Sequence, residues 1–275
     1  MQPLNSDLLA ICYDSPASPT IRFKKGNRPD GWGFGWYPRD GVGASVLKDP
    51  HVEYDMAVAS AVQRWDRFRS SIFVCHCGTH RGRSFTDTQP FVRSHAGRDW
   101  IFAHNGELGR NLDVTLPLDE RLGFEPVGQT DTEHAFCWLM GQVRAAGARS
   151  LADLSWHTIR EWFHKLNELG TLNVVWSDGL HLVAYHDRTG FNALHLLRRL
   201  PPPISTKLES DLGGAPEAVF HAPFDADVAR GSVALVPLRV GGGPSVDGAG
   251  APLARWLRDL DASPLEDIAF DAMRR

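Results

Sequence analysis

The stretch Trp-Ile-Phe-Ala-His-Asn-Gly-Glu-Leu at residues 100–108 decides how the rest of this chain is expected to fold. Its apolar first half is typical of a short buried strand, and Asn105-Gly106 is the strongest two-residue turn signal in the sequence. An ordinary hairpin turn would look the same. A second stretch, Gly-Gln-Thr-Asp-Thr-Glu at residues 128–133, predicts a turn that enters a helix with an acid at its start. A side-chain amide beside a backbone N–H can hold an oxyanion, and a carboxylate near a helix start can hold an ammonium group.

Composition limits the classes of protein to which the chain can belong. Its 275 residues allow one large domain or two small ones, and the formal net charge of -4 argues against a general binder of nucleic acid or of acidic membranes. No apolar run approaches the ~18–20 residues that span a bilayer. The N-terminus lacks a basic segment before its apolar run and carries Asp7, so we expect no export signal. Four cysteines are too few for a disulfide framework, which favours reduced thiols in a cytoplasm.

Strands are expected at both ends of the chain and two helices in its middle. Glycines interrupt the aromatic stretch 31–37, which predicts a strand that another backbone approaches closely. Thr130, with Glu133 at capping-box spacing, begins the clearest helix. Because strands and helices do not alternate as βαβ, this order favours an α+β fold of antiparallel sheets with helices outside. Further strands are expected at residues 7–13, 45–48, 71–77, 172–176, 180–185, 194–197, 218–221 and 233–236, and further helices at 55–69, 159–166 and 253–260.

Two proline-containing stretches and a glycine-rich stretch predict where regular structure ends. Residues 15–19 are rich in Pro and Ser and are expected to end the first strand. Residues 108–127 are expected to be irregular. Residues 241–250 predict a flexible linker, so we expect one domain over residues 1–240 followed by a linker and helical tail over residues 241–275.

Four motifs in this order resemble the class II glutamine amidotransferases, which belong to the N-terminal-nucleophile hydrolase superfamily. They are Asp-Gly-Trp-Gly at 30–33, the stretch at 102–106, Thr-Asp-Thr-Glu at 130–133 and the strand pair with its Ser-Asp-Gly turn at 172–185. The resemblance covers residues 7–238 and is closest to the small stand-alone members. It implies a four-layer αββα sandwich and no cofactor. It also implies an oxyanion hole from Asn105 and the Gly106 N–H, and an α-amino site at Asp131 beside Thr130.

The nucleophile position departs from the family pattern. In the family, an N-terminal cysteine attacks the amide and its own free α-amine acts as the base. The corresponding residue here is Ser6, whose nitrogen is acylated by Asn5. An amide nitrogen is not basic, and a hydroxyl is a weaker nucleophile than a thiol at neutral pH. As translated, Ser6 therefore cannot perform the family reaction. Cleavage of the chain before Ser6 would give Ser6 a free α-amine. An artificial replacement of the family cysteine by Ser6, with residues added before it, would give the same sequence.

The substrate-carboxylate position departs as well. In the family, the strand that corresponds to residues 71–77 ends in His-x-Arg, and this arginine holds the substrate carboxylate. Here the sequence is His76-Cys77-Gly78, so the arginine is missing. Arg81 or Arg83, in the loop that follows, could reach the same place. Two departures in one pocket suggest that glutamine is no longer the ligand, or that it is bound without turnover.

The cysteine and histidine cluster around residue 76 allows other interpretations. Cys75, Cys77 and His80 could bind zinc, but no second ligand pair completes a tetrahedral site, so buried core cysteines are the favoured interpretation and we predict no metal. Cys77 could also be a relocated nucleophile with His80 or His104 as its base. If His104 points into the core, we expect a hydrogen-bonded structural histidine instead.

Two functional hypotheses follow. In the first, the protein is amidotransferase-like and cleaves or recognises glutamine or another amino-acid-like γ-glutamyl amide. Hydrolysis would need no partner, whereas transfer of the released ammonia would need a synthase partner. In the second, the chain keeps the fold as a non-catalytic binding or interaction protein, a pseudoenzyme.

Overall fold

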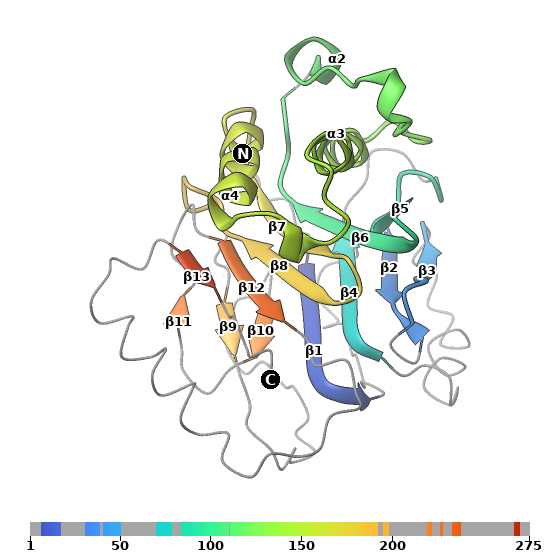
Figure 1. Cartoon of the computed structure of the whole chain (residues 1–275), viewed down its shortest axis with the longest axis vertical. Coiled ribbons are helices and arrows are strands. Elements are labelled where there is room, and N and C mark those ends of the chain that lie inside the picture. Colours follow the sequence, from blue (N-terminus) through green and yellow to red (C-terminus); the bar gives the residue numbers. More distant parts are fainter. Residues whose placement is uncertain are drawn as a thin grey trace.

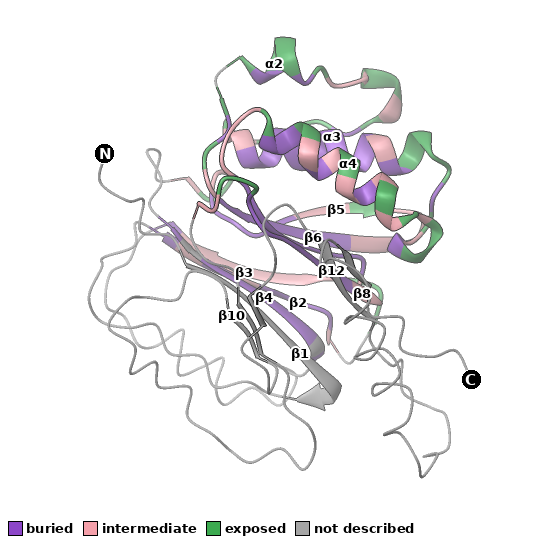
Figure 2. Cartoon of the chain, turned by 90° about the vertical axis from the view of Figure 1, so that its left-hand side faces the viewer, coloured by how far each residue is buried: buried purple, intermediate pink, exposed green. Residues whose placement is uncertain are grey.

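The computed structural model describes most of the first 191 residues and five short strand segments beyond them. The described residues are 7–17, 31–38, 41–50, 70–78, 84–109, 111–191, 195–197, 219–221, 226–227, 233–237 and 267–269. Two sheets face each other, and helices cover the outer face of one of them (Figures 1 and 2). This order of antiparallel sheets and helices confirms the α+β prediction.

The sheet beneath the helices has six strands, with β8 and β7 at its centre. All neighbouring pairs are antiparallel except β12 and β13, which run parallel. The strands, in spatial order, are β13 (Asp267–Ala269), β12 (Val233–Pro237), β8 (His181–Tyr185), β7 (Asn173–Ser177), β6 (Arg98–Asn105) and β5 (Phe91–His95).

The opposite sheet has four antiparallel strands, and a small three-stranded sheet accompanies it. The four strands, in spatial order, are β1 (Asp7–Ala17), β4 (Ser70–Gly78), β2 (Gly31–Trp36) and β3 (Ser45–Asp49). The three-stranded sheet has the order β10 (Val219–His221), β9 (His195–Leu197) and β11 (Ala226–Asp227).

Helices α3 (Asp131–Ala145) and α4 (Trp156–Asn167) lie on the outer face of the six-stranded sheet (Figure 2). Aromatic contacts fill the space between these layers: Phe102 of β6 stacks on Phe136 of α3 with ring centroids 5.0 Å apart. Burying each such ring contributes about 1.5–3 kcal/mol. The hydrophobic core cluster of buried residues lies between these helices and the sheet. The other described helical segments are the short helix α2 (Leu112–Thr115) and single 3-10 turns at Glu120–Leu122 and Leu151–Asp153.

Glycines on one face of β2 let the two sheets approach closely. A Cβ at Gly33 would lie 2.1 Å from the carbonyl oxygen of Gln89, and one at Gly35 would lie 3.1 Å from Ile101 of β6. This confirms the prediction that another backbone passes close to the strand. Helix, sheet and sheet thus form three layers of the expected αββα sandwich. The helices expected at residues 55–69 and 253–260 lie outside the described residues.

Most strand predictions are confirmed, with two corrections. The first strand does not end at the Pro/Ser-rich stretch: β1 continues to Ala17 and pairs with Ser70 after a register shift beyond Cys12, because a bulge accommodates the extra residues. Strands β5, β11 and β13 were not predicted. Strand β5 forms a hairpin with β6 through Ala96 and Gly97, which both have positive φ angles, 54° and 78°. Within the described residues, no helix is long and apolar enough to cross a bilayer.

Candidate active site

The candidate oxyanion turn follows directly from the end of β6. Asn105 is the last residue of that strand, is buried, and lies opposite Asn173 of β7. Gly106 has a φ angle of 155°, and a Cβ there would lie 2.2 Å from the carbonyl oxygen of Thr171. Both the backbone angle and the close approach exclude a side chain at this position. Residue 106 must therefore be glycine for this turn to form.

The segment between α4 and β7 holds the far side of the turn. Thr171 accepts a hydrogen bond on its hydroxyl from the Glu107 N–H at 3.0 Å, and its own N–H donates to the Glu107 carbonyl at 3.0 Å. The Gly109 N–H donates to the Leu169 carbonyl at 2.7 Å. These bonds connect segments about sixty residues apart in sequence, so the turn is fixed by the core and not by its own residues alone.

Asp131 joins the start of α3 to this turn. One carboxylate oxygen accepts a hydrogen bond from the Leu108 N–H at 2.6 Å, and the other accepts from the Thr132 N–H at 2.8 Å. Thr130 is the N-cap of the helix, and its hydroxyl accepts from the Glu133 N–H at 3.1 Å. The half-buried carboxylate sits in the first turn of α3, where the helix dipole favours a negative charge. The turn that follows Asn105 and the acid Asp131, which the sequence analysis placed on separate elements, thus lie in contact.

His104 is a structural histidine in the described part of the site. Its Nε2 lies 3.0 Å from the carbonyl oxygen of Thr171, which can only accept, so Nε2 carries the proton. Its Nδ1 lies 3.0 Å from the Thr132 hydroxyl and accepts a hydrogen bond from it. Burial lowers the pKa of His104 below its ordinary value, and the nearby Asp131 carboxylate acts in the opposite direction. The prediction of a hydrogen-bonded structural histidine is confirmed.

Gln89 was not singled out by the sequence, although it contacts the same strand end. Its side-chain amide donates to the His104 carbonyl at 2.9 Å and accepts from the His104 N–H at 2.6 Å. These two hydrogen bonds resemble the backbone bonds between neighbouring strands. They continue the pairing of β5 and β6 just beyond its last residue pair, Phe91 and Phe102. A glutamine beside a proline carries no local pattern for such a role. The partner is set by the tertiary structure.

The remaining candidates lie at the start of β1 and the end of β4, and most fall outside the described residues. Asp7, which follows Ser6 in the chain, pairs with Cys77, and Gly31 pairs with Gly78. Ser6, His80, Arg81 and Arg83 lie outside the described residues, and the structure describes only the backbone of Cys77.

The described cysteine side chains do not offer a nucleophile. Cys75 is fully buried, and burial raises the pKa of its thiol well above its ordinary value. Burial also raises the pKa of Cys137 in α3. Both remain protonated at neutral pH, and only a thiolate attacks efficiently. Among the described residues, no group of three or more His, Cys, Asp or Glu side chains could hold a metal ion.

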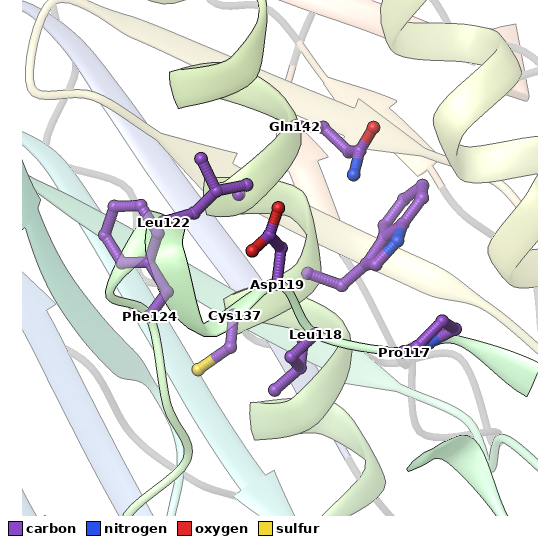
Figure 3. Close-up of a pocket in the computed structure, with 9 residues that line it drawn as sticks. Pro117, Leu118, Asp119, Leu122, Phe124, Cys137 and Gln142 are labelled. Atoms are coloured by element: carbon purple, nitrogen blue, oxygen red, sulfur yellow. The ribbon is translucent and has the colours of Figure 1, made fainter. Parts of the chain in front are cut away.

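A small cavity lies beside the second half of α3 (Figure 3). Leu122, Phe124, Cys137 and Trp138 are among its lining residues, and its volume is about 40 Å³. A space of this size holds about one or two water molecules. No residue of the turn at 104–109 or of the helix start at 130–132 lines it, so it is separate from the candidate site.

Comparison with known proteins gives a consistent result. Residues 5–234 match the family model described as "Glutamine amidotransferases class-II". The chain is 31% identical over 219 residues to an uncharacterised protein of Methanocaldococcus jannaschii, a match that covers 74% of this chain and 57% of that protein. It is 32% identical over 191 residues to "Putative glutamine amidotransferase YafJ" of Escherichia coli, which covers 68% of this chain and 71% of that protein.

One solved structure is similar along most of its length. It is the 2.0 Å crystal structure of a "predicted glutamine amidotransferase" from Pseudomonas aeruginosa, with a TM-score of 0.50 and 25% identity. The match covers 69% of this chain and 79% of that one. The chain spans little more than half the length of the Methanocaldococcus relative, at 57%.

Proposed function

The chain belongs to the class-II glutamine amidotransferases, and on that premise we propose that the turn after β6 binds glutamine or another γ-glutamyl amide. The fold is an α+β sandwich of the N-terminal-nucleophile hydrolase type. In the proposed complex, the Asn105 amide and the Gly106 N–H donate to the substrate amide oxygen. The Asp131 carboxylate binds the α-amino group, and Thr130 positions Asp131 by capping its helix.

One observation carries this proposal: the Asp131 carboxylate contacts the Leu108 N–H at 2.6 Å. This contact holds a negative charge beside the turn that would receive the amide oxygen. An ionised carboxylate can accept about four hydrogen bonds. The Asp131 carboxylate accepts one from each of two backbone N–H groups, so it can still accept a hydrogen bond from an ammonium group. A γ-glutamyl amide carries both required features, an amide carbonyl and an α-amine, on one short chain.

Turnover depends on the state of Ser6. In the family reaction, the nucleophile adds to the amide carbon, its proton passes to the free α-amine, ammonia leaves, and water then hydrolyses the acyl-enzyme. With Asn5 attached, the Ser6 nitrogen is an amide and cannot take the proton. We therefore propose that the chain as translated recognises its ligand without turning it over, and that hydrolysis requires removal of residues 1–5. Ammonia transfer would additionally require a synthase partner, and a cytoplasmic location remains our prediction.

Intact mass of the untagged protein, followed by ligand-dependent unfolding, tests the proposal. L-Glutamine at 100 times its dissociation constant should stabilise the fold by about 2.7 kcal/mol. Asp131→Asn should abolish this stabilisation, whereas Asp113→Asn, a matched change of an acid whose side chain is 94% exposed, should not. Absence of stabilisation by L-glutamine and by γ-glutamyl amides alike would refute the proposed function.

Ammonia release separates the enzymatic version from the binding version. If the mass corresponds to a chain that begins at Ser6, we expect release of ammonia, and Asn105→Ala should reduce its rate by about 10²–10³-fold. The second candidate function is a non-catalytic binding protein, which the combination of Ser6 and Gly78 favours. Ligand stabilisation without ammonia release in a chain that begins at Ser6 would identify that case.

A further inference from the structure

A buried aspartate binds the segment that holds the candidate oxyanion turn. Asp187 follows the end of β8 by two residues and is fully buried. One carboxylate oxygen accepts hydrogen bonds from the Leu172 N–H and from the side-chain amide of Asn167, both at 2.7 Å. The other oxygen accepts from the N–H and hydroxyl of Thr189 and from the Phe191 N–H. The carboxylate thus connects α4, the segment between α4 and β7, and the loop after β8.

Two sets of contacts join Asp187 to the turn, and the first begins at Leu172. The preceding residue, Thr171, exchanges two hydrogen bonds with Glu107 of the turn, each at 3.0 Å. The Thr171 carbonyl also accepts from Nε2 of His104 at 3.0 Å. The segment therefore lies against the turn at one residue and is held by the carboxylate at the next.

The second set of contacts involves two asparagines. The Asn167 amide, which donates to Asp187, also donates to the Gly170 carbonyl at 2.8 Å. The Asp187 N–H donates to the side-chain carbonyl of Asn173 at 3.0 Å, and Asn173 pairs with Asn105 where β7 lies beside β6. A displacement of Asp187 would therefore reach both the segment beside the turn and the strand neighbour of Asn105.

This arrangement suits an ionised carboxylate. Burial raises the pKa of Asp187, but hydrogen bonds, foremost that of the Thr189 hydroxyl, outweigh burial and hold the pKa below its ordinary value. All five hydrogen bonds are donated to the carboxylate by its neighbours. A side-chain amide in the same place would turn its NH₂ group towards other donors, and buried N–H groups would lose their acceptor.

We propose that Asp187 is a positioning residue of the γ-glutamyl site, whose carboxylate holds the segment between α4 and β7 against the candidate oxyanion turn. This inference rests on the proposed function. Asp187 acts through Leu172 and Asn167 and does not touch the ligand. Because the Asn105 amide and the Gly106 N–H must both reach one oxygen of the ligand, a small displacement of the turn should weaken binding.

A second buried aspartate provides a matched control. Asp178 lies in the turn between β7 and β8, at the opposite end of this hairpin from Asp187, and it is also fully buried. Its carboxylate accepts hydrogen bonds of 2.8–2.9 Å from the Ser150 hydroxyl and from the N–H groups of Leu151, Leu180 and His181. The changes Asp187→Asn and Asp178→Asn therefore remove the same charge from similar surroundings at opposite ends of one hairpin.

Amide hydrogen exchange, measured by NMR on the full-length chain, tests the positioning. Asp187→Asn should accelerate exchange of the Glu107 and Thr171 N–H groups by about 10-fold or more, because the bonds between these residues would open more often. Asp178→Asn should leave both rates within about twofold of the wild type. It should instead accelerate exchange of the Leu151 N–H, which donates to Asp178.

Titration calorimetry with L-glutamine tests the consequence for the site. The affinity should fall by about fivefold or more in Asp187→Asn, which is the factor that one hydrogen bond contributes. It should stay within about twofold of the wild type in Asp178→Asn. If Asp187→Asn fails to fold, as judged by circular dichroism, Asn167→Ala replaces it in both measurements. This variant removes one donor to Asp187 together with the bond to the Gly170 carbonyl.

The outcomes separate this inference from the proposed function. Wild-type exchange rates at Glu107 and Thr171 in Asp187→Asn would overturn the inference, even if L-glutamine binds. Equal losses of affinity in Asp187→Asn and Asp178→Asn would also overturn it, because a general loss of stability would then explain both. Failure of the wild-type protein to bind any γ-glutamyl amide would overturn the proposed function, whereas the exchange rates would still decide whether Asp187 positions the turn.

Discussion

At the scale of single residues, His104 shows how one neutral side chain can hold several parts of the site. Its ring connects Thr171, which contacts the candidate oxyanion turn, with Thr132, which follows Asp131 in α3. The Thr171 carbonyl fixes the proton on Nε2, so Nδ1 remains an acceptor for the Thr132 hydroxyl. Protonation of Nδ1 would break this arrangement. His104 is therefore unsuited to act as a general base unless these bonds are broken.

This arrangement predicts a specific dependence of stability on pH. Burial lowers the pKa of His104 in the folded state below 6.5, its ordinary value in the unfolded chain. Between these two pKa values the unfolded state binds more protons, so the free energy of unfolding should decrease as the pH falls below about 6.5. We expect His104→Gln to be less stable at pH 7.5 but to show a shallower decrease between pH 7 and pH 5, measured by urea denaturation.

The control for this measurement is His157→Gln, which replaces an exposed histidine on α4. It should keep the wild-type dependence of stability on pH. Equal slopes for His104→Gln and the wild type would show that His104 does not stay neutral in the folded protein.

At the scale of elements, the start of α3 differs from the capping box that its spacing suggested. Thr130 caps the helix as expected. The Glu133 side chain instead accepts hydrogen bonds from the N–H groups of Val127 at 3.1 Å and Gly128 at 2.7 Å, and it pairs with Arg93 of β5. Glu133 therefore binds the turn before the helix to the edge of the six-stranded sheet. This contact positions the helix start, and with it Asp131, relative to the sheet.

Glu133→Gln tests this role of the buried carboxylate. The amide keeps a similar shape but loses the charge that pairs with Arg93, whose side chain is only 17% exposed. Leaving one partner of a buried pair uncompensated costs about 3–5 kcal/mol, and we expect somewhat less here because Arg93 is partly exposed and also donates to two backbone carbonyls. Guanidinium denaturation should show the loss, whereas the matched change Glu125→Gln, at an exposed acid of the same segment, should have little effect. A difference below about 0.5 kcal/mol for Glu133→Gln would contradict the role.

At the scale of the whole molecule, the site depends on how closely the two sheets approach. Asn105 belongs to the six-stranded sheet, whereas the start of β1 and the end of β4 belong to the four-stranded one. Glycine at residue 33 brings β2 against Gln89, and Gln89 in turn holds the end of β6. The spacing of the sheets and the position of the candidate oxyanion turn are therefore connected through the same contact.

Gly33→Ala should separate the sheets locally. Its Cβ would lie 2.1 Å from a backbone oxygen, which no rotamer change can relieve. Overpacking of this kind costs about 1–3 kcal/mol or more, and we also expect weaker binding of L-glutamine because Gln89 must move. Gly43→Ala is the matched control, since its nearest atom would be 3.9 Å away. Thermal denaturation and calorimetry measure the two effects. Unchanged stability and binding in Gly33→Ala would contradict the proposed coupling.

The sequence by itself determined the features that local chemistry specifies. The Asn105-Gly106 turn, the Thr130 cap, the apolar face of α3 and most strands follow from residues that lie close together in the chain. Local rules are less informative where a bulge carries β1 past Pro16 or where a short edge strand such as β5 has no clear alternation.

Only the tertiary structure decided which of these features meet. The bonds from Asp131 to Leu108, from His104 to Thr171 and from Gln89 to His104 join residues 15 to 67 positions apart. Strand register and the packing of α3 on the sheet bring them together, and neither is encoded in a local window of sequence. The position of the His76 ring over Gly78 is of the same kind, because a neighbouring strand sets the face that both residues share and the empty space above a glycine becomes visible only when its surroundings are in place.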